Sequence, residues 1–498
     1  MPKFDFISKF FSKLQTKIPD IEIPTLTKNE GLKFYNTLSG KKENFVPIRA
    51  GKVGMYTCGP TVYSTPHLGN LRTMIFADFL KRTLQYNGFK VKHVMNITDV
   101  GHLTGDRDMG EDKMEMEAKK EHKTAWEIAE HYTNIFKKNL EDLNILPASI
   151  LCKATEHIAE QIAMIEELER RDYTYRTNDG IYFDTSKISD YTKLSHQNLE
   201  ALKEGARVEK NDEKKNPTDF ALWKFSPHAT SKEEKRQMEW QSPWGIGFPG
   251  WHIECSAMSM RYLGEQFDIH SGATDLINIH HTNEIAQSEA ATSKKPWVKY
   301  WMHGAFLNMS EGKKMSKSAG HDVSLDNTFT KKKISPLVFR FAALNTHYRK
   351  PMEWNDDIVE TAKNGFDNFI RRVRALGNKI GDVDKNLKQQ FTQSINDDLN
   401  MSQALAITNE VFKSEIDDED KLATVLDFDK VLGLELDKIV SEKPAVNKIP
   451  ENINKLLSNR QSARKTKNWV EADNIRDELL KHGWEVKDTA DGQKVTKM

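Results

Sequence analysis

The stretch that decides the fold runs from Gly54-Met-Tyr-Thr-Cys-Gly-Pro-Thr-Val-Tyr63 through Pro66-His-Leu-Gly-Asn70 to an apolar-periodic segment that ends at Tyr86. An apolar run that is broken by glycine and proline and followed by helical periodicity predicts a strand, a loop and a helix. In such a unit the small-residue loop lets the backbone approach a phosphate, and the positive end of the helix favours an anion. His67 and Asn70 add side-chain donors there. An isolated match of this kind is more often an ordinary strand-to-helix turn.

A second stretch, Glu311-Gly-Lys-Lys-Met-Ser-Lys-Ser-Ala-Gly320, places lysine and hydroxyl donors between two glycines. This composition suits a mobile loop that folds over a polyphosphate and stabilises the charge that develops as pyrophosphate leaves. Taken alone, such a run is usually a solvated lysine-rich loop. Because both stretches occur in one chain, separated by a sequence with an α/β-like pattern, we interpret them as parts of one nucleotide site.

With these two stretches the chain resembles the class I aminoacyl-tRNA synthetases. The family's two signatures match His67, Leu68, Gly69 and Asn70, and Lys314, Met315, Ser316, Lys317 and Ser318. The resemblance implies an α/β fold with a Rossmann-type catalytic domain that adenylates an amino acid. It implies that ATP, accompanied by Mg²⁺, contacts six residues of the two signatures: His67, Gly69, Asn70, Lys314, Ser316 and Lys317. Four of these are also implied to serve catalysis: His67, Asn70, Lys314 and Lys317. The first signature usually ends in histidine, and the asparagine that ends it here can also donate a hydrogen bond to phosphate or ribose.

A third group of residues has the chemistry of a metal site. Cys58 and Cys255 each end a short apolar segment, and His280 and Glu284 lie four residues apart, on one face if that segment is helical. Two thiolates, an imidazole and a carboxylate suit a tetrahedral zinc ion, and thiolate favours zinc over magnesium or calcium. The wide separation of the two cysteines is not that of a zinc finger. From spacing alone, buried structural cysteines and a surface histidine are the stronger interpretation.

The motifs GMYTCGPTVY, FPGWHIECSAMS, FDIHSGATDL and HHTNEIAQSEA resemble those of the cysteinyl-tRNA synthetase family, and the similarity runs from about residue 31 to the C-terminus. It implies ATP-dependent ligation of cysteine to tRNA-Cys through a cysteinyl-adenylate. It also implies one zinc ion per chain, bound by Cys58, Cys255, His280 and Glu284, which selects the substrate thiolate. The implied substrate contacts are Gly59, Thr98, Trp251, His270 and Asp275, with His252 beside them. The family commonly has glutamate where Thr282 stands.

The length of 498 residues, 38% of them apolar, predicts about three domains with real cores. We expect a catalytic domain in two halves with an inserted connective peptide, an α-helical bundle that positions tRNA, and a small anticodon module. The expected ranges are 1–30 for an N-terminal extension, 31–150 and 247–330 for the catalytic halves, 151–246 for the insertion, 331–450 for the bundle and 451–498 for the module.

The helical bundle is predicted from apolar residues at spacings of three and four in ISPLVFRFAALNTHY, DIVETAKNGFDNFIRRVRALGNKI and NMSQALAITNEVFK. In the terminal module, Trp469 and Trp484 could stack on exposed bases beside a basic stripe. The stripe consists of Arg460, Arg464, Lys465 and Lys467. A solvated amphipathic helix with both tryptophans in its core is the alternative.

Composition sets the remaining limits. The 73 basic and 73 acidic residues cancel, so local patches must supply the attraction to RNA. Three cysteines are consistent with a reducing compartment, and no apolar run is long enough to span a membrane. We expect a cytoplasmic monomer. The first thirty residues form a lysine-containing amphipathic segment that is a loosely packed extension, a membrane-surface or partner helix, or a targeting segment.

Two other functions are alternatives to ligation of cysteine to tRNA-Cys. A tRNA-independent ligase of the same ancestry joins cysteine to an amino sugar and resembles a synthetase truncated after the helical region, whereas this chain retains a C-terminal module. A catalytically silent, zinc-stabilised RNA-binding protein is the more distant alternative. The intact His67, Lys314 and Lys317 count against it.

Overall fold

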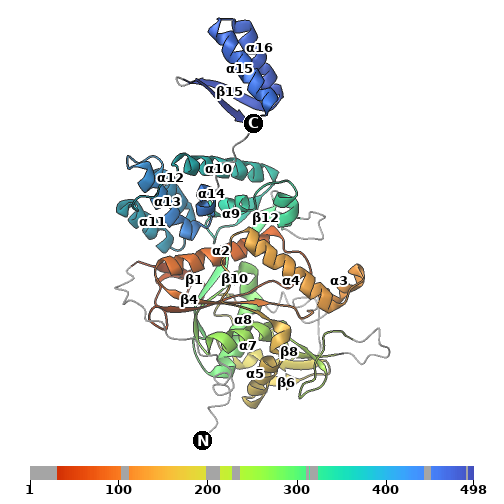
Figure 1. Ribbon diagram of the computed structural model, residues 1–498. Coiled ribbons are helices and arrows are strands. Elements are labelled where there is room, and N and C mark those ends of the chain that lie inside the picture. Colours follow the sequence, from red (N-terminus) through yellow and green to blue (C-terminus); the bar gives the residue numbers. More distant parts are fainter. Residues whose placement is uncertain are drawn as a thin grey trace. The chain divides into compact units, whose positions relative to one another are not determined.

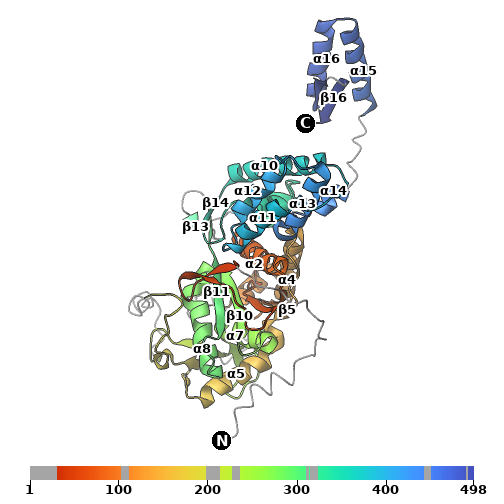
Figure 2. The same cartoon turned by 90° about the vertical axis from the view of Figure 1, so that its left-hand side faces the viewer.

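The computed structural model describes residues 31–102, 111–197, 213–226, 236–309, 313–314, 323–441, 450–489 and 492–497 (Figures 1 and 2). The chain divides into two compact units, Met1–Asp437 and Lys438–Met498. The expected N-terminal extension, as well as Met315, Ser316, Lys317 and Ser318 of the second signature, lie outside the described residues. Among the described helices, none is long and apolar enough to cross a membrane.

A five-stranded parallel sheet forms the centre of the larger unit. Its strands are β3 (Lys52–Thr57), β4 (Lys90–Ile97), β5 (Ile150–Lys153), β10 (Phe267–Ala273) and β11 (Val298–Gly304). They pair in the order β11-β10-β3-β4-β5, so the direction of strand addition reverses between β3 and β10. In open α/β sheets, ligands bind outside the carboxyl ends of the strands at such a switch point.

Helices cover both faces of this sheet, as a fully parallel sheet requires. Helix α2 (Leu68–Tyr86) lies on one face with α4 (Ala125–Asp142), and α5, α7 and α8 lie on the other (Figure 1). The bounds of the last three are Ile158–Arg170, Trp251–Leu263 and Thr282–Thr292. The predicted order of strand, loop and helix around the first signature is confirmed by β3 and α2. A hairpin of β1 (Lys33–Asn36) and β2 (Lys41–Asn44) precedes them, and the short α3 (Lys113–Glu121) precedes α4.

The inserted region forms a separate antiparallel sheet in the order β6-β7-β8-β9. Its strands are β6 (Thr174–Arg176), β7 (Gly180–Phe183), β8 (Phe220–Phe225) and β9 (Gly247–Pro249). Two expected boundaries fall inside elements or beside them. Strand β5 continues the parallel sheet past residue 150, and β9 completes the inserted sheet just before α7 begins.

The region after the catalytic fold is helical, as its periodicity predicts. Its helices are α9 (Leu337–Leu344), α10 (Asp356–Ala375), α11 (Lys385–Asn396), α12 (Met401–Val411), α13 (Asp418–Leu432) and α14 (Leu436–Ser441). A small sheet joins it to the catalytic fold. In that sheet β12 (Leu307–Met309) lies between β13 (Lys313–Lys314) and β14 (Met352–Trp354).

The C-terminal unit packs α15 (Glu451–Lys465) and α16 (Trp469–Lys481) with the hairpin β15 (Trp484–Thr489) and β16 (Gly492–Lys497). Its core contains Ile453, Leu457, Ile475, Leu479, Trp484 and Val486. Two predictions for this unit are corrected. Trp484 is a core residue and cannot offer its face to a base, and Arg460 is buried because it pairs with Asp488. Trp469 remains exposed.

Candidate metal centre and active site

Three segments that are distant in the sequence bring the predicted metal ligands together at the switch point of the sheet. Cys58 directly follows β3, and its backbone N–H donates to the carbonyl oxygen of Ser271 on β10. Cys255 lies on α7, His280 lies in a π-helical turn, Ile277–His281, and Glu284 lies in the first turn of α8. The turn and α8 are continuous, so His280 and Glu284 share one face as the spacing of four predicts.

The donor atoms of these four side chains all lie within 4.8 Å of one another. The two sulfur atoms are 3.8 Å apart, Cys58 Sγ is 3.9 Å from Glu284 Oε1, and His280 Nε2 is 3.0 Å from the same oxygen. Zinc–sulfur bonds of about 2.3 Å at a tetrahedral angle separate two sulfurs by about 3.8 Å. The separation of the two thiols, the donor types and the burial of all four residues therefore fit a tetrahedral zinc ion.

The charges within this group stabilise one another. Burial would lower the pKa of His280, but Glu284 and Cys255 raise it to about 10. Burial would raise the pKa of Glu284, but His270 and His280 lower it to about 2. The pKa of Cys255 falls to about 7 despite burial, through Cys58 and His280. At neutral pH Glu284 is therefore already ionised and the thiolate of Cys255 is favoured, whereas His280 holds a proton that a bound cation would have to displace.

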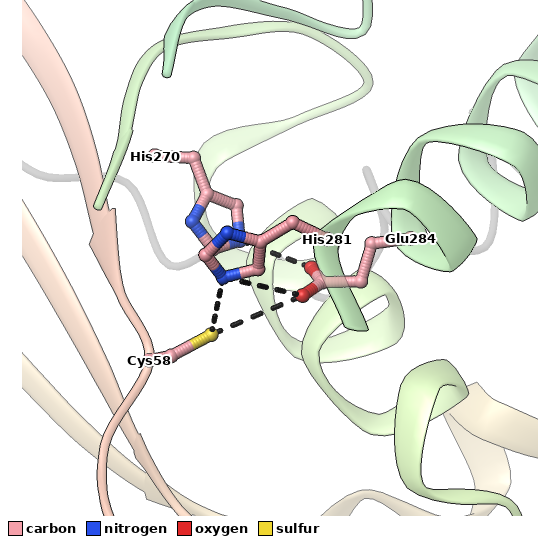
Figure 3. A group of neighbouring side chains, drawn as sticks. All are labelled: Cys58, His270, His281 and Glu284. Carbon is pink, nitrogen blue, oxygen red and sulfur yellow. Dashed lines mark hydrogen bonds and ion pairs between the residues drawn. The ribbon is translucent and has the colours of Figure 1, made fainter. Parts of the chain in front are cut away.

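Further histidines surround the four predicted ligands. His270 and His281 form a second set of donors with Cys58 and Glu284 (Figure 3). His270 Nε2 lies 3.0 Å from Glu284 Oε2, and His281 Nε2 lies 3.3 Å from Cys58 Sγ. On its other side His281 Nδ1 contacts His303 Nε2 at 2.8 Å. Partners of this kind orient metal ligands and raise their basicity.

The sequence interpretation assigned His270 to the substrate and missed His281 and His303. In the structure His270 has no exposed surface and contacts a predicted metal ligand. The pair His280-His281 could have revealed His281, because two adjacent histidines in a helix with a carboxylate three and four residues later can reach the same carboxylate from neighbouring positions. His303 follows a long gap in the sequence, and no local pattern indicates it.

The first signature lies at the N-terminus of α2, where the loop meets the helix. His67 is the N-cap: its Nδ1 accepts from the N–H of Asn70 at 3.2 Å, and Asn70 Oδ1 accepts from the N–H of His67 at 3.2 Å. A Cβ on Gly69 would lie 2.9 Å from the His67 ring, so a glycine is needed for this cap. The remaining N–H groups and the helix dipole make this end of α2 a suitable anion site.

The segment after the second signature contacts the first one. The N–H of Leu68 donates to the carbonyl oxygen of Val323 at 3.1 Å, and His67 forms an isolated β-bridge with Ser324. Lys314, the first residue of the second signature, pairs with Asn308 across β13 and β12. The backbone that follows the predicted phosphate loop thus lies beside the start of α2.

The predicted substrate residues come from several elements: Gly59 and Thr98 follow β3 and β4, and Trp251, His270 and Asp275 belong to α7, β10 and the turn after β10. Gly59 follows Cys58, and a Cβ there would lie 1.8 Å from the carbonyl oxygen of Asn96, so only glycine fits. Thr98 is buried after β4, and its Oγ1 accepts from Asn96 Nδ2 at 3.0 Å. Trp251 begins α7 with its ring centroid 4.5 Å from that of His280. Asp275 is exposed in a short helical turn between β10 and the π-helical turn.

One buried acid in this region was not predicted. Glu254, on α7 beside Cys255, has no exposed surface, and its Oε1 lies 2.9 Å from Nε2 of His102. Burial and the nearby Asp99 raise the pKa of Glu254 well above its ordinary value. The contact joins His102, in the segment after Thr98, to α7.

Family models match both units of the chain. A model described as the class I (C) tRNA synthetase catalytic domain matches residues 44–364, and one described as the cysteinyl-tRNA ligase anticodon binding domain matches residues 446–495. The second match argues against a truncated, tRNA-independent ligase, because such a ligase would lack this region.

Individual proteins agree with the family models. The chain is 47% identical to cysteine–tRNA ligase 1 of Burkholderia lata over 464 residues, which cover 93% of this chain and 96% of that protein. It is 45% identical to cysteine–tRNA ligase of Treponema denticola over 489 residues, which cover 92% and 98%. In structure it is similar to a methionyl-tRNA synthetase of Mycobacterium tuberculosis, with a TM-score of 0.52 at 14% identity over 78% of this chain and 93% of that one. This structural likeness concerns the fold alone.

Proposed function

Because the chain belongs to the cysteinyl-tRNA synthetase family of class I aminoacyl-tRNA synthetases, whose members join cysteine to tRNA-Cys, we propose which of its residues bind zinc, ATP, cysteine and tRNA. Cys58, Cys255, His280 and Glu284 hold a zinc ion at the base of the pocket. The proposal is supported by their convergence within 4.8 Å in a fully buried group.

When bound, zinc supplies a Lewis acid that prefers a thiolate to a hydroxyl, and so separates cysteine from serine more sharply than an apolar pocket would. The protein holds the four donors in place before substrate arrives. His270 fixes the Glu284 carboxylate through Oε2 and leaves Oε1 toward His280 and the cysteines. Trp251 borders the group through its contact with His280 and limits access to it.

We propose that adenylation takes place at the N-terminus of α2. His67, Gly69 and Asn70 hold the phosphates of ATP with Mg²⁺, and Lys314, Ser316 and Lys317 stabilise the pyrophosphate that leaves. The cap formed by His67 and Asn70 and the contact of Leu68 with Val323 support this assignment, because they bring the segment that follows the second signature to the helix end that carries the first. Catalysis is then mainly positioning and electrostatics, without a protein nucleophile.

Substrate and RNA are assigned to separate surfaces. Gly59, Thr98, Trp251, His270 and Asp275 are proposed to form the cysteine pocket, with His270 acting through Glu284. The helical region, residues 331–450, is proposed to position tRNA, and the C-terminal unit is proposed to contact the anticodon. Trp469 supports the last assignment, because its ring is exposed and can stack on a base; the guanidinium of Arg464, which also pairs with Asp488 at 2.8 Å, lies 5.5 Å from that ring. We further propose that the enzyme acts as a monomer, which light scattering tests.

The decisive experiment is cysteine-dependent ATP–pyrophosphate exchange with serine as competitor. It is run on protein of known zinc content, before and after chelation, and each sample is also tested for charging of tRNA-Cys. We expect about one zinc per chain, exchange that chelation abolishes and zinc restores, rejection of serine, and charged tRNA. Exchange without charging would favour the amino-sugar ligase, and the absence of exchange would contradict both functions.

A further inference from the structure

A buried ionic group lies far from the metal ligands, where the catalytic fold meets the helical region. Its centre is Asp78, on the third turn of α2, which is the helix that begins at His67. Asp78 Oδ2 accepts from Arg82 Nε at 2.7 Å and from Arg340 Nη2 of α9 at 2.6 Å, and Oδ1 accepts from the N–H of Leu146 at 2.9 Å. The exposed fractions of Asp78, Arg82 and Arg340 are 2%, 7% and 0%, so the group is excluded from water.

The other donors of the two guanidiniums bind carbonyl groups at the C-terminal ends of two more helices. Arg340 Nε donates to the carbonyl of Leu432, the last residue of α13, at 2.7 Å, and Arg82 Nη1 donates to that of Lys430 at 3.1 Å. At the end of α4, Arg340 Nη1 donates to Leu143 at 3.1 Å and Arg82 Nη2 to Asn144 at 2.6 Å. Unpaired carbonyls and the negative end of the dipole favour a cation at each of these ends.

Nearby residues leave no room for the group to rearrange. A Cβ on Gly433 would lie 2.4 Å from Arg340 Nη2, and the backbone of Gly433 has a φ of +68°, so a side chain there would both strain the chain and displace the guanidinium. Asn144 Nδ2 donates to the carbonyl of Gly433 at 2.9 Å, which joins the ends of α4 and α13 directly. The ring of Phe79 lies 4.9 Å from the Arg340 guanidinium.

From this arrangement we propose that Asp78, Arg82 and Arg340 form a positioning hub that fixes the helical region relative to α2, so that tRNA held by the helical region presents its 3′-end to the aminoacyl-adenylate. None of the three is a catalytic residue in this proposal. Helix α2 carries the first signature at one end and the hub three turns along. The same helix therefore links the position of the nucleotide site to the position of the helical region. The inference rests on the proposed role of the helical region in positioning tRNA.

A purely structural salt bridge and a positioning hub predict different kinetics. Loss of stability lowers both half-reactions in proportion to the amount of folded enzyme. Loss of position leaves adenylate formation intact, because ATP and cysteine bind within the catalytic fold, but slows transfer to tRNA. Misplacement of reacting groups by about 1 Å can slow a reaction by about 100-fold.

The experiment measures two rates on folded, zinc-loaded enzyme well below its unfolding temperature. The first is cysteine-dependent ATP–pyrophosphate exchange, and the second is single-turnover transfer of cysteine from the preformed adenylate to tRNA-Cys. Two variants perturb the hub differently. Arg340→Lys keeps the positive charge but lacks the branched guanidinium that contacts Leu432, Leu143 and Asp78 at the same time. Gly433→Ala keeps every charged group and displaces the Arg340 guanidinium.

Arg171→Lys, directly after α5, is the matched control. Arg171 lies outside the helical region, pairs with Glu167 of α5 and donates through Nη1 to Ser293 Oγ at 2.5 Å. We expect both hub variants to keep exchange within about twofold while transfer falls by about 10- to 100-fold, and the control to retain both rates.

Unchanged transfer in the folded hub variants, or an equal fall of both rates, would overturn the inference. These outcomes concern the hub alone, because failure of the proposed function would already show as missing exchange or charging in the unaltered enzyme.

Discussion

The candidate metal centre and the C-terminal unit differ in how deeply their functional side chains are buried. Cys255 and Glu284 are 1% and 0% exposed, whereas Trp469 is 55% exposed. In the buried group each donor holds another, so a single substitution disturbs the whole group. On the C-terminal unit, one ring can be removed without opening a core. If the proposed roles are right, selection of the amino acid depends on a buried, mutually supported group and recognition of RNA depends on an exposed side chain, so mutations in the two regions should have separable effects.

The largest expected effect is that of Cys255→Ala. The variant lacks one of the two thiols, so we expect the zinc content to fall from about one per chain toward zero. Cysteine-dependent exchange should fall by more than about 100-fold, since loss of even an outer partner of a metal ligand costs about 10- to 100-fold. Zinc is measured by mass spectrometry of the purified protein.

Cys152→Ala is the matched control for that variant. Cys152 is also buried, but its Sγ contacts the carbonyl oxygen of Met95 at 3.6 Å and is not one of the clustered donors. This variant should retain zinc and exchange. Equal zinc contents in the two variants would contradict the assignment of Cys255 as a ligand.

His270→Phe tests the next layer of the buried group. The substitution keeps an aromatic ring against Trp301, with which His270 stacks at 4.5 Å, and removes the contact with Glu284 Oε2. We expect the affinity for zinc to fall by about 10- to 100-fold, measured by competition with a chelator. His157→Phe, which changes a buried histidine that contacts Lys153 and Tyr262, should leave zinc affinity unchanged. Equal affinity in both variants would mean that His270 does not support the centre.

The sequence predicts the metal centre better than its surroundings, and the reason is physical. Local patterns predict the strand, loop and helix around Cys58, as well as the helical spacing of His280 and Glu284. Spacing alone could not pair Cys58 with Cys255, because parallel pairing of β3 with β10 and the packing of α7 bring them together. The family resemblance supplied that step. Neither His303 nor the contact of Asp78 with Arg340, 262 residues away, leaves any local pattern in the sequence.

The two tryptophans of the C-terminal unit show the same limit on a smaller scale. Both Trp469 and Trp484 stand among charged residues, and composition treats them alike. Trp469 is the first residue of α16, after the N-cap Asn468, and its ring remains in water. Trp484 begins β15 and packs against the helices. Which ring is exposed depends on where the turn ends and the strand begins, and boundaries are the least predictable part of an element.

Trp469→Ala should have a smaller and different effect from the metal-centre variants. Stacking of one base on an aromatic ring contributes about 1 to 3 kcal/mol, so affinity for tRNA-Cys should fall by about 5- to 150-fold while cysteine-dependent exchange is unchanged. Binding is measured by fluorescence anisotropy of labelled tRNA. Val470→Ala changes the neighbouring side chain, which is 75% exposed, and should bind like the unaltered enzyme. A loss of exchange in Trp469→Ala would break the separation of the two regions.

The smallest expected effect concerns the ion pair between Arg460 and Asp488, which buries Arg460 and so excludes it from the predicted basic stripe. Asp488 accepts two hydrogen bonds from Arg460, both at 2.9 Å, and these lower the pKa of Asp488 while burial opposes them. A carboxylate whose pKa is lower in the folded state stabilises the fold above its unfolded value of about 3.9 and loses this contribution as pH falls through the folded value. Because the Asp488 side chain is 38% exposed, screening limits the contribution to less than about 1 kcal/mol.

Unfolding of the C-terminal unit in the full chain is followed by fluorine NMR of 5-fluorotryptophan at Trp484, which is 5% exposed and so senses loss of the core. At pH 6 we expect a lower urea midpoint for Asp488→Asn than for the unaltered protein, since the variant lacks the charged pair. The difference should begin to shrink below about pH 4 and should be lost once the pH has fallen through the lowered folded-state pKa of Asp488, where the unaltered side chain also becomes neutral. Asp473→Asn removes an exposed acid of the same unit and should follow the unaltered protein at every pH. A difference that persists at low pH would mean that Asp488 stabilises the unit by packing or neutral hydrogen bonds, and Arg460 would then be buried for a reason other than its charge.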